Sequence, residues 1–227
     1  MTPKDIIIKI LNCFENDNCS PLTNYTSIYI YRDGTDNKKQ ITLGRGFTSM
    51  GGSLWEVFKK YKDLSSVKTT ADKLLSYESQ KNSESLAGDK EFLKLILETS
   101  KTDENFRKAQ DVIYDELYWS KGQDWFDRNG FTLPLSMAVV QDSFLQSGSI
   151  PNFLRSRFDE MVPKNGGSEQ KWMSQYIDVR HNWLAHHSRT ILNNTVYRTD
   201  FFKTEMKKNN WNLDKFPLCP NGTTINK

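Results

Sequence analysis

Long apolar runs are missing from this chain of 227 residues, and no stretch approaches the roughly 18 apolar residues of a membrane-spanning helix. The first ten residues, MTPKDIIIKI, also lack the order of basic, apolar and small residues that marks a signal peptide. We therefore expect no membrane anchor and no leader within this sequence.

Neither sign of charge dominates the chain. It holds 31 basic and 28 acidic side chains, which are interspersed and give a net charge of +3. Such a balance does not favour nucleic acid binding. It also makes the chain a poor match to a strongly cationic ligand.

Cysteine and histidine are scarce, with three of each. An odd number of cysteines argues against a scaffold built from disulfides, although Cys13 and Cys19 could pair if the chain bends between them. Neither these cysteines nor the histidines show the paired spacing of a zinc site. We expect no metal and no organic cofactor.

Helical periodicity is present along most of the chain, which is long enough to bury a real core. In the first predicted helix, residues 5–16, apolar residues recur at helical spacing as far as Phe14. Further helices are predicted over 54–64, 69–80, 89–100, 105–130 with a break at Gly122, 133–148, 149–161 and 169–187.

One segment departs from this helical pattern. Residues 28–48, IYIYRDGTDNKKQITLGRGFT, begin as an alternating strand, break at Asp33-Gly34, and resume before Gly-Arg-Gly at 44–46. This pattern predicts a β-hairpin. A small β element among helices indicates an α+β fold that is mostly α.

Glu15 follows the apolar face of the first predicted helix, ahead of this hairpin. Hydrolysis of a glycosidic bond needs one carboxylic acid to protonate the leaving oxygen and a second carboxylate to activate water or attack. A general acid must carry a proton near neutral pH, and an apolar setting favours that form. Glu15 could have such a setting beside Phe14, but a glutamate here is also typical of a solvated helix end.

The order of motifs resembles a known family. Glu15, Asp33-Gly34, GRGFT at 44–48 and Gly51-Gly52 are similar to the active-site region of glycoside hydrolase family 46, the chitosanases of the lysozyme-like superfamily. IYRD followed by ITLGRGF also resembles phage-type lysozymes of that superfamily. Three later segments continue the resemblance: PLSMAVVQDSFLQSG, PKNGGSEQKWMSQYIDVRHNWL, and SRTILNNTVYRTDFF with NNWNLDKFP.

The resemblance implies a fold and a domain organisation. It predicts one lysozyme-like catalytic domain over residues 1–227, with two helical lobes and a small β-hairpin sheet flanking an active-site cleft. The minor lobe would span about 15–110 and include the hairpin. The major helical lobe would comprise 1–14 and 111–227.

The resemblance also implies catalytic roles, with Glu15 as the general acid. In the family the general base is an aspartate immediately before Gly-Arg-Gly, where this chain has Leu43. Asp33 is the best substitute for that base. Asp36 is a second candidate base or a substrate contact, and it is also typical of a turn.

Two threonines and one ion-pair network complete the implied site. Thr48 would hold the attacking water, with Thr42 as an alternative that could also contact substrate; both also fit as ordinary strand residues. The network behind the acid would consist of Asp142, Arg180, Arg198 and Arg45. The alternative is a buried salt-bridge cluster that only ties helices together.

Aromatic residues near the hairpin could bind sugar, because flat sugar faces stack on rings. Tyr29, Tyr31 and Trp55 are the candidates. The tryptophans of the later helices have spacing that favours the core: Trp119, Trp125, Trp172 and Trp183.

We therefore expect an endo-acting glycoside hydrolase that cleaves a β-1,4-linked hexosamine polymer by an inverting acid/base mechanism. The alternatives are a lysozyme-like enzyme acting on peptidoglycan and a catalytically impaired glycan-binding relative; a helical interaction domain does not explain the ordered motifs. The expected partner is a polysaccharide, with neither nucleic acid nor membrane. We expect a secreted or periplasmic monomer whose leader is absent from this sequence.

Overall fold

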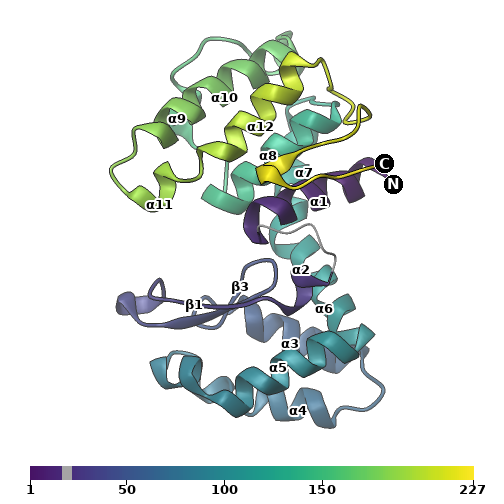
Figure 1. Cartoon of the computed structure of the whole chain (residues 1–227), viewed down its shortest axis with the longest axis vertical. Coiled ribbons are helices and arrows are strands. Elements are labelled where there is room, and N and C mark those ends of the chain that lie inside the picture. Colours follow the sequence, from purple (N-terminus) through teal and green to yellow (C-terminus); the bar gives the residue numbers. More distant parts are fainter. Residues whose placement is uncertain (17–21) are drawn as a thin grey trace. The chain divides into compact units, whose positions relative to one another are not determined.

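The computed structural model describes residues 1–16 and 22–227, which fall into two compact units (Figure 1). The first unit comprises residues 1–16 and 118–227, and the second comprises residues 22–117. Helices predominate in both units, and the strands form one small antiparallel sheet. The predicted mostly helical α+β class is confirmed.

The first unit is built around helix α8. Its helices are α1 (Pro3–Asn16), α7 (Ser120–Arg128), α8 (Pro134–Ser147), α9 (Asn152–Arg155), α10 (Glu169–Ala185), α11 (Thr190–Asn193) and α12 (Val196–Lys207), with 3₁₀ turns at Pro163–Asn165 and Pro220–Gly222. Helix α8 contacts α1, α7, α10 and α12, and all its residues from Leu135 to Ser143 are buried. A helix that is buried all round lies at the centre of a core.

The second unit packs helices beside the sheet. Its elements are α2 (Thr23–Thr26), β1 (Ile28–Tyr31), β2 (Gln40–Leu43), β3 (Phe47–Thr48), α3 (Ser53–Leu64), α4 (Thr69–Leu75), α5 (Lys90–Thr102) and α6 (Glu104–Tyr114), with 3₁₀ turns at Thr35–Asn37, Glu78–Gln80 and Glu84–Gly88. Aromatic rings fill its core: Trp55 stacks on Phe92, and Phe58 stacks on Phe106, with ring centroids 6.1 and 6.0 Å apart.

The sheet has the strand order β1-β2-β3, and both pairs are antiparallel. Thr42 of β2 lies opposite Tyr29 on one side and Thr48 on the other, so these three side chains share a face. The next residue, Leu43, pairs with Phe47, and both are fully buried on the opposite face. Alternation along β2 therefore separates a polar face from a core face.

The structure confirms most of the predicted helices and corrects three. Those predicted over 5–16, 54–64, 89–100, 133–148 and 169–187 are present. Only Asn152–Arg155 of the segment 149–161 is helical, and Pro151 precedes it with extended backbone. The helix predicted over 69–80 ends as an α-helix at Leu75.

The long helix predicted over 105–130 does not break at Gly122. It is distorted earlier, in a π-helical turn at Asp115–Trp119, which contains the boundary in sequence between the two units. Gly122 lies within α7 and faces Gln141, whose Oε1 lies 2.7 Å from where a Cβ would stand. Glycine is needed there for close helix packing rather than for a break.

Cys13 is buried and disulfide-bonded, and Cys219 carries a free thiol. The predicted pairing of Cys13 with Cys19 lies outside the described residues. Within residues 1–16 and 22–227, no group of three or more His, Cys, Asp and Glu side chains could hold a metal ion. No helix in that part of the chain is long and apolar enough to cross a membrane.

Candidate active site

Glu15 lies near the C-terminal end of α1, and this end packs against α12 of the first unit. The preceding residue, Phe14, is buried and packs edge-on against Tyr197, Phe201 and Phe202 of α12. The side chain of Glu15 itself is 34% exposed. The carboxylate of Glu15 is therefore partly exposed to solvent and does not have the fully apolar surroundings considered for it.

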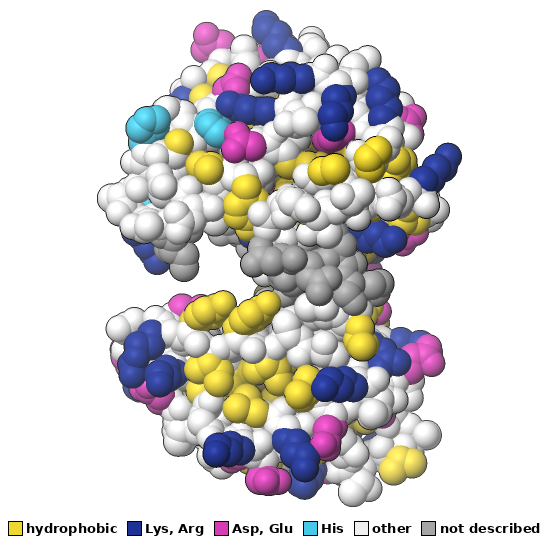
Figure 2. All heavy atoms as spheres, in the orientation of Figure 1, with side chains coloured by type: hydrophobic (Ala, Val, Ile, Leu, Met, Phe, Trp, Pro, Cys, Tyr) yellow, Lys and Arg dark blue, Asp and Glu magenta, His cyan; other side chains and the backbone are white. Residues whose placement is uncertain are grey.

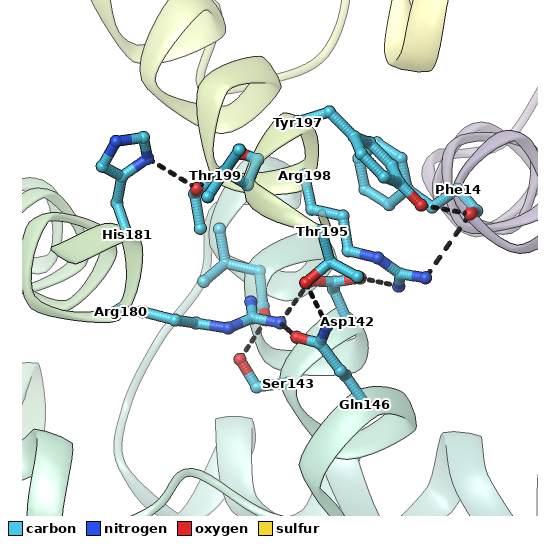
Figure 3. Close-up of polar contacts among 12 residues, drawn as sticks. Phe14, Asp142, Ser143, Gln146, Arg180, His181, Thr195, Tyr197, Arg198 and Thr199 are labelled. Carbon is cyan, nitrogen blue, oxygen red and sulfur yellow. Dashed lines mark hydrogen bonds and ion pairs between the residues drawn. The ribbon is translucent and has the colours of Figure 1, made fainter. Parts of the chain in front are cut away.

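Arg198 of α12 holds the carboxylate of Glu15 with a hydrogen bond of 2.6 Å from its Nη2 to Oε1. Its Nη1 donates to Asp142 Oδ1 at 2.8 Å, and Asp142 Oδ2 lies 2.7 Å from Nη2 of Arg180 (Figure 3). Burial opposes the charge on Arg198, but the carboxylates of Asp142 and Glu15 raise its pKa above the usual range. The guanidinium therefore stays charged and orients Glu15.

Two further side chains extend this network, and the sequence analysis missed them. Arg180 donates to the amide oxygen of Gln146, whose Nε2 donates to Thr195 Oγ1 at 2.9 Å (Figure 3). Gln146 stands four residues after Asp142 on α8, so both face the same neighbours. This spacing of four residues from Asp142 is the sequence signal that could have identified Gln146.

The last turn of α1 is also held by hydrogen bonds to its backbone. The hydroxyl of Tyr197 donates to the carbonyl oxygen of Phe14 at 2.7 Å, and Nη2 of Arg198 reaches the same oxygen at 3.4 Å (Figure 3). Nδ2 of Asn221 donates to the carbonyl of Cys13 at 3.4 Å. Burial raises the pKa of the Tyr197 hydroxyl, which therefore remains a donor.

We expect Tyr197→Phe to lower kcat about fivefold with little change in KM, because one neutral hydrogen bond contributes about 1 kcal/mol to the position of Glu15. The ring contact with Phe14 is kept in this variant. Steady-state kinetics at several substrate concentrations measures the split. A fivefold rise in KM with kcat unchanged would show that Tyr197 contributes to substrate binding instead.

In the second unit, Asp33 lies two residues after the end of β1 and is exposed. Its Oδ1 accepts a hydrogen bond of 3.1 Å from Nε2 of Gln40, at the start of β2. Thr42 and Thr48 stand on the same sheet face as Gln40, because Gln40 and Thr42 are two residues apart on one strand. One carboxylate and two hydroxyls are therefore presented by one β element.

Leu43 occupies the position that precedes Gly-Arg-Gly, and it is fully buried beside Phe47. Strand alternation points it away from the face of Thr42. Gly44 follows with φ of 54° and approaches the backbone so closely that a Cβ would lie 2.3 Å from the carbonyl oxygen of Asn24. The backbone here needs glycine, and an acid at 43 would enter the core.

Arg45 forms a cluster of its own, which corrects the expectation that it supports the network of Asp142. Its guanidinium pairs with Asp111 and lies over the rings of Tyr25 and Tyr114, 5.3 and 4.4 Å from their centroids. The Tyr25 hydroxyl also donates to Asp111 at 3.0 Å. Arg45 thereby ties the loop after β2 to α6 within the second unit.

Most of the chain matches a known protein family. Residues 9–218 match Glycosyl hydrolase family 46. This chain belongs to that family.

Relatives of the family cover nearly the whole chain. A chitosanase from Bacillus subtilis (strain 168) is 29% identical over 204 residues, which are 82% of this chain and 72% of the relative. The crystal structure of native chitosanase from Bacillus subtilis MY002 aligns with a TM-score of 0.76 and 25% identity, covering 99% of this chain and 98% of the other. A complex of a Gynuella sunshinyii chitosanase with chitotetraose aligns with a TM-score of 0.81 and 20% identity, covering 99% and 96%.

As a family 46 glycosidase, the chain has the lysozyme-like fold that the sequence predicted. Among the expected sugar contacts, Tyr29 and Tyr31 stack on each other with centroids 5.7 Å apart, and Tyr31 is 54% exposed. Trp55 is 1% exposed, and its Nε1 donates to the carbonyl of Ser49 at 2.7 Å. Trp55 is therefore a core residue and not a sugar platform, because α3 turns it toward Phe58.

Asp36 is placed as a turn residue. It adopts a left-handed conformation with φ of 57° in the turn Thr35–Asn37, and its carboxylate lies 3.5 Å from Nζ of Lys38. Aspartate tolerates this conformation better than most residues. In contrast to Asp33, Asp36 is paired with a lysine of its own turn.

Proposed function

We propose that this chain is an endo-acting chitosanase that cleaves β-1,4-linked hexosamine polymers with inversion at the anomeric carbon. Membership of glycosyl hydrolase family 46 over residues 9–218 carries the proposal, together with the similarity to a chitosanase of Bacillus subtilis. The ordered contacts of Glu15 with Arg198 and of Asp33 with Gln40 support it.

In the proposed reaction Glu15 donates its proton to the glycosidic oxygen as the bond from that oxygen to the anomeric carbon breaks. Asp33 accepts a proton from a water molecule whose oxygen bonds the same carbon from the opposite face. One water molecule is consumed. The anomeric carbon receives its hydroxyl group, and the leaving oxygen receives a proton from Glu15. The hydroxyl group of Thr48, or that of Thr42 beside it, would form a hydrogen bond with that water.

Substrate binding is proposed for the aromatic pair of β1, in which Tyr29 is half-buried and Tyr31 is exposed. The rings of Tyr29 and Tyr31 are close to parallel, with an interplanar angle of 13°. The ring of each tyrosine offers an apolar surface to the face of a sugar, and its hydroxyl group is a polar group at the ring edge.

We expect the first product released from a β-linked chitosan oligomer to be the α-anomer, because single displacement inverts the anomeric carbon. Proton NMR of the reaction mixture, recorded before mutarotation, measures this. Release of the β-anomer would contradict the mechanism.

Peptidoglycan is a second candidate substrate, favoured by two observations. The chain has a net charge of +3, and it lacks the acid that the family places at position 43. Basic and acidic side chains are interspersed over the face of both units drawn in Figure 2. Release of reducing ends from chitosan and from purified cell walls, compared in parallel, decides between the two polymers, and faster release from chitosan is the expected result.

We also propose that the protein acts outside the cytoplasm. The disulfide of Cys13 supports this, because such bonds persist in oxidising compartments. Detection of the native protein in the medium or the periplasm, rather than in the cytosolic fraction, tests it.

A further inference from the structure

Gln40 is a buried carboxamide at the first position of β2, with 7% of its surface exposed. Its Oε1 accepts a hydrogen bond of 3.2 Å from the backbone N–H of Met50. Its Nε2 donates to Oδ1 of Asp33 at 3.1 Å. One side chain thus links the loop before α3 to the carboxylate after β1.

The orientation of this amide is fixed by its two partners. A backbone N–H can only donate, so it must meet the amide oxygen, and the amide nitrogen must then face Asp33. The donated hydrogen bond fixes the direction in which Oδ1 of Asp33 accepts. A carboxamide offers an acceptor at one end and donors at the other, so it can hold both partners at once.

The backbone that carries Asp33 is also held in place. Gly34 donates to the carbonyl of Lys38 at 3.1 Å and accepts from the N–H of Asn37 at 3.0 Å. A Cβ on Gly34 would lie 2.5 Å from Sδ of Met50, so the turn packs directly on the residue that anchors Gln40. Asp33 therefore has a fixed position over the amide.

Two charged residues close to Asp33 in sequence, Arg32 and Lys38, pair with other carboxylates. Arg32 lies 3.0 Å from Glu84 of the turn Glu84–Gly88, which packs on β2, and Lys38 lies 3.5 Å from Asp36. Asp33 itself accepts a hydrogen bond from the neutral amide of Gln40. A neutral donor can orient a base without removing its ability to accept a proton.

We propose that Gln40 is the positioning residue for the general base: it holds Oδ1 of Asp33 and leaves Oδ2 to take the proton from water. This inference rests on the proposed function, in which Asp33 is that base. It predicts a role in turnover for a residue that does not touch the substrate.

The test compares Gln40→Glu with the wild-type chain. A carboxylate at 40 still accepts from the N–H of Met50, so the structural half of the contact is kept while Asp33 meets a like charge. We expect kcat to fall about tenfold with KM unchanged, and the acidic limb of the pH profile to move up by about one unit. Thermal unfolding of the variant, measured beside the kinetics, shows whether it is folded.

Asn37→Asp is the matched control, because it adds the same charge to the exposed turn without facing the amide. We expect it to leave the acidic limb in place. Gln40→Met removes both hydrogen bonds at similar volume and carries the test if Gln40→Glu does not fold. Gln40→Met should lower kcat and shift the acidic limb of the pH profile by less than Gln40→Glu does.

Asp33→Asn separates the two ideas. If Asp33→Asn is inactive while neither variant of Gln40 moves the acidic limb beyond the control, Gln40 is only a structural residue and the inference is overturned. If Asp33→Asn keeps wild-type turnover, the proposed base is wrong and its positioning residue falls with it. Loss of activity in Asp33→Asn together with the shifted limb supports both.

Discussion

Replacing Glu15 by glutamine is expected to lower kcat about a thousandfold, because a general acid contributes roughly 10²–10⁴ to the rate. The amide oxygen of the glutamine can still accept the hydrogen bond that Arg198 donates at 2.6 Å. The side chain therefore keeps its place but has no acidic proton to give. Hydrolysis of chitosan oligomers, followed by the release of reducing ends, measures the loss.

The leaving group provides the sharpest check on this role. A nitrophenyl leaving group needs little protonation, so Glu15→Gln should lose much less activity on a nitrophenyl chito-oligosaccharide than on chitosan. Glu98→Gln is the matched control, since Glu98 is a 62% exposed helix residue of the second unit and should have no effect. Wild-type turnover of chitosan by Glu15→Gln would show that another group is the acid.

The sequence predicted those features of the site that depend on neighbours along the chain. The apolar spacing that ends at Phe14 requires α1 to bury one face, and this places Glu15 at its end. Asp142 stands in the buried part of a helix and is its one charged residue, so a partner for its charge had to exist. The family resemblance supplied the identity of the partners, Arg180 and Arg198.

The features that the sequence could not predict depend on contacts between distant residues. Tyr197 meets the carbonyl of Phe14 across 183 positions, and Arg45 meets Asp111 across 66. No local pattern distinguishes such an arginine from one in another network. Trp55 is different, because its spacing of three from Phe58 is a local signal of a core-facing position, which the expectation of a sugar contact overlooked.

Asp142→Asn is expected to destabilise the first unit by about 3–5 kcal/mol, because it leaves two buried guanidinium groups without their shared counter-charge. Asp142 is fully buried, and Arg180 and Arg198 are 1% and 5% exposed. An asparagine of the same size cannot offset either charge and presents an N–H₂ group to one of the two donors. Differential scanning calorimetry should record a melting temperature lower by roughly 10 °C.

Asp178→Asn is the control for this change, since Asp178 is 65% exposed and pairs with Lys203 at 3.0 Å on the same unit. An exposed pair contributes less than about 1 kcal/mol, so its loss should barely move the transition. Well below the melting temperature, Asp142→Asn should also turn over more slowly at unchanged KM, because Arg198 then loses the contact that aims it at Glu15. Equal melting temperatures for the two variants would mean that the buried cluster does not depend on the charge of Asp142, and Arg198 would need another anchor to orient the acid.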